Sequence, residues 1–123
     1  MGPPAPPSGQ VPAVTDVRVV LMTAPDRATA EKLALTLVGE RLCACANLVP
    51  GVTSLFWWDG AVQRSEETLV VMKTTPESLD ALTARAAELH PYDVPEILAL
   101  PVDKGLVAYM EWVGRETQGK GGR

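Results

Sequence analysis

The sequence predicts an α+β fold of the ferredoxin-like type, a β-α-β-β-α-β sandwich with a long central hairpin and an extra C-terminal helix. Three observations predict it. A β-branched apolar run at residues 17–24 is followed by a stretch with helical periodicity. A long strand-like region is then divided by an Asp-Gly pair, and a second helical stretch leads into a last strand. This order of elements is that of the split βαβ arrangement.

The chain of 123 residues is long enough for one domain of ordinary size and too short for two. With 46% hydrophobic and 21% charged residues, it has the composition of a globular protein. Prolines crowd the start of the chain, and the end, QGKGGR, is glycine-rich and polar. We therefore expect a disordered Pro-rich leader over residues 1–15, a single domain over 16–117 and a disordered tail over 118–123. The leader could alternatively bind an aromatic groove as a polyproline helix.

The net charge of -4 would repel a phosphate backbone, and no cluster of Lys and Arg offsets it, so nucleic acid is not an expected partner. No apolar run reaches the roughly 18 residues that a membrane span needs. The start of the chain lacks the basic and apolar segments of a signal peptide. We expect a cytoplasmic protein with no membrane contact.

The first strand is expected over Val17–Ala24, a short buried run. Beyond Asp26, apolar residues recur at helical spacing and predict a helix that covers one face of a sheet. These residues are Ala30, Leu33, Ala34, Leu37, Val38 and Leu42. Gly39 lies inside this stretch, where it either allows a close approach of two backbones or loosens the last turn.

The region from Cys43 to Thr75 has the composition of strands. Asp59-Gly60 suits a type I′ hairpin turn, in which both central residues need positive φ. Pro50-Gly51 in the middle of the first arm predicts a kink or bulge in an edge strand.

Each arm of this hairpin would have about 15 residues and a length of roughly 50 Å. A domain of about 100 residues has a radius of gyration of only about 13 Å, so part of the hairpin must project. The projecting part carries LFWW at Leu55–Trp58, and an exposed apolar strand is an aggregation hazard unless another chain covers it. We expect a homo-oligomer assembled through the hairpin.

Thr75 and Pro76 are typical of a helix N-cap and first turn, and the helix should end before Pro91. One face of this helix carries Leu79, Leu82, Ala86 and Leu89. The segment VPEILALPV is expected as the fourth strand, and Gly105 should open a last amphipathic segment.

Several separated motifs carry a resemblance to a known family. They are TAPDRATAEKLALTLVGERLCACANLVPGVTSLFWWDG, LVVMKTT, HPYDVPEILALPV and YMEWV. In order and spacing these stretches are similar to the CutA divalent-cation-tolerance family, over about Val17–Trp112. The resemblance implies a ferredoxin-like fold related to the nitrogen-regulatory PII proteins and a homotrimer assembled through the long hairpins. This agrees with the oligomer expected from the exposed apolar strand.

The resemblance also implies a divalent metal site. Some members of the family bind copper through a cysteine at the end of the first strand, with the histidine and glutamate of the His-Pro-Tyr segment. The matching positions here are Met22, His90 and Glu96. A thioether is neutral and binds Cu(II) less well than a thiolate, although it suits Cu(I). We therefore expect a site for Cu(II) or Zn(II) at His90 and Glu96, with Met22 as a weaker ligand, and no organic cofactor.

His90 is the only histidine of the chain, and two interpretations of it stay open. Pro91 and Pro95 could stiffen the connection so that neutral His90 and ionised Glu96 act as metal ligands, with Asp93 or a neighbouring chain completing the set. Alternatively, His90 ends a helix, and its protonated form stabilises the negative end of that helix by about 0.3–1 kcal/mol.

If the trimer of the family forms, Tyr92, Lys73, Trp58 and Cys45 become candidate ligand-binding residues of the same cleft. Aromatic walls with one ammonium group suit a small anionic or metal-chelated ligand. Trp58 could instead pack at an interface. Cys45 and Cys43 should face the same way without forming a disulfide, either as a soft-metal pair or as small buried residues.

The expected function is divalent metal binding, with copper the most plausible ion, in a homotrimer that contributes to cation tolerance. A trimeric PII-like signalling module that binds a small ligand is the alternative. An enzyme is not expected, although a cysteine, a histidine and an acid could together form a nucleophilic site. The chain has no P-loop, nucleophile elbow, zinc-protease or dinucleotide-binding motif.

Overall fold

The computed structural model describes residues 15–117, so the expected disorder of the leader up to residue 14 and of the tail from 118 lies outside the described residues. The predicted order of elements is confirmed. The elements are β1 (Arg18–Ala24), α1 (Arg27–Gly39), β2 (Cys45–Trp58), β3 (Ala61–Thr74), α2 (Pro76–Leu89), β4 (Ile97–Pro101) and α3 (Val107–Glu116). Among the described residues, no helix is long and apolar enough to cross a bilayer.

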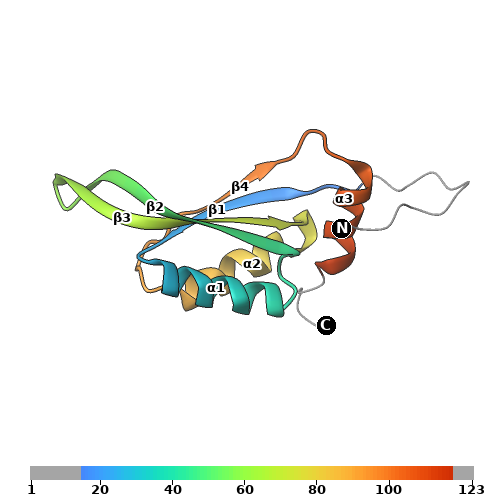
Figure 1. Cartoon of the computed structure of the whole chain (residues 1–123), viewed down its shortest axis with the longest axis horizontal. Coiled ribbons are helices and arrows are strands. Elements are labelled where there is room, and N and C mark those ends of the chain that lie inside the picture. The colour runs from blue at the N-terminus through green and yellow to red at the C-terminus, as the bar shows by residue number, and fades with distance from the viewer. Residues whose placement is uncertain (1–14, 118–123) are drawn as a thin grey trace, which may run out of the picture.

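The four strands form one antiparallel sheet in the order β2-β3-β1-β4, which is the ferredoxin-like arrangement. Helices α1 and α2 lie side by side against one face, and α3 lies at the end of the sheet opposite the hairpin tip (Figure 1). The core fills the layer between sheet and helices. Its fully buried residues include Val20, Met22, Leu37, Val70, Met72 and Leu82.

Helix α1 has a capping interaction at each end. The carboxylate of Asp26, its N-cap, accepts a hydrogen bond of 2.7 Å from the backbone N–H of Thr29. The helix ends at Gly39, three residues before the end of the predicted apolar stripe, because Arg41 takes a left-handed conformation with φ 61°. The N–H groups of Arg41 and Leu42 then bond back to the carbonyls of Val38 and Leu37 in a Schellman motif. Leu42 still reaches the core, but from the loop.

The hairpin of β2 and β3 has the predicted turn and the predicted bulge. Asp59 and Gly60 have φ angles of 56° and 79°, as a type I′ turn requires. The register of β2 on β3 shifts between Val49 and Val52, where Gly51 has φ 79°. In Figure 1 the tip of the hairpin projects beyond the helices. It exposes apolar side chains, among which Trp57 is 74% exposed.

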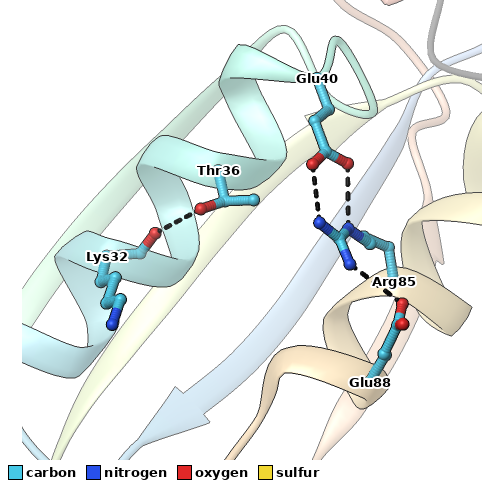
Figure 2. A network of polar contacts seen from close by, with 5 residues as sticks. All are labelled: Lys32, Thr36, Glu40, Arg85 and Glu88. Carbon is cyan, nitrogen blue, oxygen red and sulfur yellow. Dashed lines mark hydrogen bonds and ion pairs between the residues drawn. The ribbon is translucent and has the colours of Figure 1, made fainter.

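Helix α2 begins at the predicted position, with Thr75 as N-cap and Pro76 in the first turn, although the Thr75 side chain forms no capping hydrogen bond. An ion-pair network joins α2 to the end of α1 (Figure 2). Arg85 donates to both carboxylate oxygens of Glu40, at 3.0 and 2.9 Å, and to Glu88 at 3.1 Å. The guanidinium group lowers the pKa of Glu40 through these hydrogen bonds. The network links the C-terminal end of α1 to α2 at the surface of the protein.

Candidate ligand-binding cleft

A cleft of about 690 Å³ lies between the outer part of the hairpin and the loop that joins α2 to β4. It is open on one side, and its wall combines apolar, hydroxyl and acidic side chains. The lining residues are Thr23, Ser54, Leu55, Phe56, Trp58, Ser65, Glu67, Tyr92, Asp93, Val94 and Glu96. A cavity of this size is in the range of small-molecule sites in proteins.

Strand alternation decides which side chains of β1 and β3 reach the cleft. Successive side chains of a strand point to opposite faces of the sheet, so Met22 and Thr23 point apart. Met22 is fully buried in the core between sheet and helices, whereas Thr23 lines the cleft. On β3 the same alternation directs Glu67 to the cleft and its neighbour Glu66 away from it, where Glu66 pairs with Arg64 at 3.2 Å.

His90 supports the cleft from behind, since it is buried and is absent from the lining. Its Nδ1 accepts a hydrogen bond of 3.1 Å from the backbone N–H of Tyr92. Its Nε2 therefore carries the proton of the neutral ring and donates to the carbonyl oxygen of Thr23, 2.7 Å away. Both ring nitrogens of His90 are occupied, and the ring ties the loop after α2 to the end of β1.

Tyr92 and Glu67 form the main polar contact inside the cleft. The Tyr92 hydroxyl donates to Oε2 of Glu67 at 2.7 Å. Burial raises the pKa of Tyr92 to about 12, and the hydrogen bond to Glu67 and the charge of that carboxylate act in the same direction. Tyr92 is therefore a neutral donor at physiological pH, and it links the loop to β3.

Two further candidates for the cleft, Cys45 and Lys73, lie at another place on the sheet. Cys45 and Lys73 are direct cross-strand partners at the far end of the hairpin, near α3. The thiol of Cys45 lies 3.4 Å from the hydroxyl of Tyr109, and the ammonium of Lys73 donates to the side-chain carbonyl of Asn47. Within one chain, Tyr92 and Trp58 line the cleft and Lys73 and Cys45 do not, while the cleft expected for all four residues depends on the trimer and stays a prediction.

The predicted metal ligands are also separated. Glu96 is exposed in the cleft, Met22 is buried in the core, and His90 has both nitrogens in hydrogen bonds. Between residues 15 and 117, no three His, Cys, Asp or Glu side chains stand close enough to hold a metal ion together. One chain therefore offers carboxylates to a metal ion, but not a complete set of ligands.

The two cysteines are free thiols, and Cys43 is buried. Burial raises the pKa of Cys43 to about 12, with a smaller effect from the nearby Cys45, so the Cys43 thiol stays protonated at neutral pH. A protonated thiol is a poor nucleophile and a poor metal ligand. This geometry favours the interpretation of Cys43 as a small core residue.

Sequence reasoning missed several residues of the cleft, among them Glu67 and Thr23. Glu67 was not singled out, although it shares one face of a strand with Leu69 and Val71, and a charged residue in such an apolar row is a recognisable signal. Thr23 was not singled out either, because a threonine at the end of a strand carries no specific signal.

A family model described as CutA1 divalent ion tolerance protein matches residues 18–116 of the chain. The protein named divalent-cation tolerance protein CutA of Thermus thermophilus is 46% identical over 99 residues, which are 80% of this chain and 96% of that protein. A protein of the same name from Escherichia coli is 45% identical over 95 residues, or 77% and 85% of the two chains. Protein CutA 1, chloroplastic, of Oryza sativa is 43% identical over 100 residues, which are 81% of this chain. The chain spans only 56% of the length of that rice protein.

Solved structures of proteins with these names are also similar to this chain. CutA1 from Oryza sativa superposes with a TM-score of 0.83 at 40% identity, over 86% of this chain and 97% of the other. The divalent cation tolerance protein of Thermus thermophilus superposes with a TM-score of 0.81 at 44% identity, over 83% and 99%.

Proposed function

Because the chain belongs to the CutA1 divalent ion tolerance family, we propose that it is a non-enzymatic homotrimer that binds divalent metal ions and contributes to cation tolerance. Cu(II) is the first ion to test, followed by Zn(II), since imidazole and carboxylate groups suit both. The free thiols of Cys43 and Cys45 fit a reducing compartment such as the cytoplasm.

One observation carries the metal proposal. The three charged side chains that line the cleft, those of Glu67, Asp93 and Glu96, are all acidic. A concave surface lined by one sign of charge raises the local concentration of ions of the opposite sign. Because one chain holds no complete ligand cluster within residues 15–117, the proposal places the missing ligands on a neighbouring chain of the trimer.

His90 can bind a metal ion only if one of its two hydrogen bonds is broken. A metal ion at Nδ1 would displace the backbone N–H of Tyr92, and the net loss of one hydrogen bond is about 1 kcal/mol. A metal ion at Nε2 would displace the carbonyl of Thr23 in the same way. We therefore propose Glu96 as the primary ligand and His90 as one that binds after local rearrangement. Met22 would have to leave the core, so it is not part of the proposed site.

The trimer is supported by the apolar surface of the hairpin and the open face of the sheet. Leu55, Phe56, Trp57 and Trp58 are exposed on β2, which is also an edge strand. Leu98 and Leu100 are exposed on β4, the other edge. Exposed apolar edge strands of this kind are expected to be covered by other chains.

Native mass spectrometry during a Cu(II) titration tests both parts of the proposal, because one spectrum gives chain number and metal stoichiometry. We expect a trimer with bound metal for the wild type, weaker binding for Glu96→Gln, and a smaller loss for His90→Ala. The matched control is Glu66→Gln, which removes a carboxylate on the opposite side of β3. A trimer that binds no metal, or that binds equally well in Glu96→Gln, would contradict the proposed site.

A second candidate function is a trimeric PII-like module that binds a small molecule and presents the result to a partner. The observation that favours it is the cleft volume of about 690 Å³, which is far larger than a metal ion needs. A protein partner whose binding depends on an occupied cleft would support this function.

A further inference from the structure

A second cavity, of about 320 Å³, lies between the start of α2, the end of α3 and the residues that precede β1. Its lining carries four hydroxyl groups, those of Thr15, Thr75, Ser78 and Thr117, and two carboxylates, those of Asp16 and Glu77. None of the described lining residues belongs to the hairpin or to β4, and α3 stands at the opposite end of the sheet from the hairpin tip (Figure 1). The cavity therefore lies outside the surfaces on which the proposed trimer rests.

Thr117 supplies the observation that points to a ligand. It is 7% exposed, and its hydroxyl oxygen is the only side-chain oxygen or nitrogen within residues 15–117 that is buried without a hydrogen-bond partner. Buried polar groups in proteins are almost always hydrogen-bonded, so such an exception requires an explanation. Thr75 in the same wall is 6% exposed, and although it is the N-cap of α2, its side chain forms no capping hydrogen bond. A bound molecule that donates to these hydroxyl oxygens would remove the exception.

The charges around the cavity are negative. Asp16 and Glu77 are exposed at its edge, and neither forms an ion pair with another residue in the described part of the chain. Thr117 is the C-cap of α3, so the negative end of that helix dipole lies at the cavity. The positive end of α2 also lies here, but Glu77 in its first turn offsets it. Asp16 and the end of α3 thus leave a net attraction for cations.

Three classes of ligand fit this wall poorly. An anion would meet two carboxylates and no basic side chain among the described lining residues. A metal ion would find no cluster of three His, Cys, Asp or Glu side chains within residues 15–117. A quaternary ammonium compound would find no aromatic face, because the described lining contains no aromatic residue. The class that remains is a cation with several N–H donors.

A guanidinium group has these properties. It is planar, permanently charged and weakly hydrated, and its five N–H groups can bond to carboxylates and to hydroxyl oxygens. Bidentate pairing with a carboxylate adds specificity that an ammonium group lacks. The volume of about 320 Å³ is at the lower end of the range for ligand sites, which suits a compact molecule.

We propose that this cavity binds the guanidinium group of a small molecule. Asp16 and Glu77 are its charge partners, and the hydroxyl of Thr117 is an acceptor inside the cavity. The site is separate from the acidic cleft near the hairpin, so the inference goes beyond the proposed function and does not depend on metal binding.

Methylguanidinium and methylurea test the charge of the ligand, because the two molecules have nearly the same size and shape. Each has one methyl resonance, and saturation transfer from the full-length protein to that resonance reports binding. We expect methylguanidinium to bind at least about tenfold more tightly than methylurea, and more tightly than methylammonium. No binding of methylguanidinium, or equal binding of either other compound, would overturn the proposal.

Variants of the wall locate the binding. Asp16→Asn should weaken methylguanidinium binding about tenfold, and the matched control Glu31→Gln, which removes an exposed carboxylate on α1, should leave it unchanged. Thr117→Val should weaken binding several-fold without lowering the stability of the free protein in urea, because it removes a hydroxyl that has no partner within residues 15–117. Equal losses in Asp16→Asn and Glu31→Gln, or unchanged binding in Thr117→Val, would contradict the site. A loss of stability in Thr117→Val would assign its hydroxyl a partner within the protein and would contradict its role as an acceptor for the ligand.

Two further measurements separate this cavity from competing explanations. Displacement of methylguanidinium by Zn(II), or a loss of binding in Glu96→Gln, would place the binding in the acidic cleft and overturn this inference alone. Binding of methylguanidinium without Cu(II) or Zn(II) binding would support this inference and contradict the metal function. Lys120 and Arg123 follow Thr117 in the sequence, so the last control is the full-length chain with Lys120→Ala and Arg123→Ala. Binding seen only in that variant would mean that these basic residues occupy the cavity, and it would overturn the proposal.

Discussion

The imidazole Nε2 of His90 lies 2.7 Å from the carbonyl oxygen of Thr23, so a single buried ring joins the end of α2 to the end of β1. The other ring nitrogen accepts the N–H of Tyr92, whose hydroxyl reaches Glu67. The arrangement makes His90 a support for the cleft wall, and it assigns a structural reason to the one histidine of the chain.

Replacing His90 by Ala should lower stability substantially. The change leaves the Thr23 carbonyl and the Tyr92 N–H without partners, and we expect a loss of about 2–3 kcal/mol in the free energy of unfolding. Urea unfolding of the metal-free protein measures it. His90→Gln, which can keep a donor for Thr23, should lose less; equal stability of His90→Ala and the wild type would show that the two hydrogen bonds contribute little.

Asp26 should make stability depend on acid pH. The N–H of Thr29 holds the pKa of this carboxyl below its usual value of 3.8, so the ionised cap stabilises the folded protein. This contribution is complete above pH 3.8 and is lost as the pH falls through the lower folded-state pKa. Asp26→Ala should therefore have a lower melting temperature than the wild type at neutral pH. The difference between the two melting temperatures should disappear in acid. Asp26→Asn retains a hydrogen-bond acceptor for the N–H of Thr29. A large loss of thermal stability in that variant at neutral pH would therefore contradict the capping role of Asp26.

Gly39→Ala should stabilise the protein by up to about 1 kcal/mol, because glycine is a poor helix residue and a Cβ at this position would meet nothing within 4 Å among residues 15–117. Of the two roles expected for Gly39, close approach of backbones within the chain is thereby wrong. Gly60→Ala is the matched control, since its surroundings are equally open but its φ is 79°. That variant should lose about 1 kcal/mol in urea unfolding. A destabilised Gly39→Ala would point to a contact with a neighbouring chain.

Thr74→Val should destabilise the junction between α1 and β2. The fully buried hydroxyl of Thr74 donates to the carbonyl of Leu42 at 2.7 Å, and removing it leaves that carbonyl unpaired at a cost of about 1–2 kcal/mol. Thr74→Ser keeps the hydroxyl and loses only a methyl group. If Thr74→Ser were the less stable of the two on thermal unfolding, packing of the methyl group would outweigh the hydrogen bond.

Trp57→Asp should dissociate the proposed trimer, because it places a charge on the most exposed apolar residue of the hairpin. Light scattering coupled to gel filtration gives the mass directly. Leu35→Asp is a suitable control, since Leu35 is 68% exposed on α1, a helix that lies away from the hairpin tip in Figure 1. Loss of assembly in Leu35→Asp, or a trimer in Trp57→Asp, would exclude the hairpin as the main interface.

The fold was predictable because its signals are local. Asp59-Gly60 defined the turn, Pro50-Gly51 marked the bulge, and helical periodicity identified α1 and α2. The end of α1 was less predictable, because Leu42 continues the apolar stripe while Arg41 breaks the helix in a conformation usually given to glycine. Strand β4 is also shorter than expected, beginning at Ile97.

The cleft was predictable only in part, because it joins segments that are distant in the sequence. Tyr92, Trp58 and Glu96 were identified from the motifs that contain them, and the structure brings them to one cavity. Lys73 could not be placed from its motif, since the position of the cleft along β3 depends on where the loop after α2 meets the hairpin. The hydrogen bonds of His90 to Thr23 and of Tyr92 to Glu67 hold this loop against the sheet, and the sequence alone does not reveal these contacts.

The central position of β1 has a consequence for the order of folding. Its partners, β3 and β4, come much later in the chain, whereas β2 and β3 are joined by a tight turn. Closing short loops is fast and closing long ones is slow, so we expect the hairpin to form first and the sheet to be completed only when β4 docks on β1. A chain still on the ribosome would then present the hairpin, with its exposed apolar side chains, before α2 and β4 have been synthesised, and rapid pairing with sister chains or chaperone protection becomes part of its biogenesis.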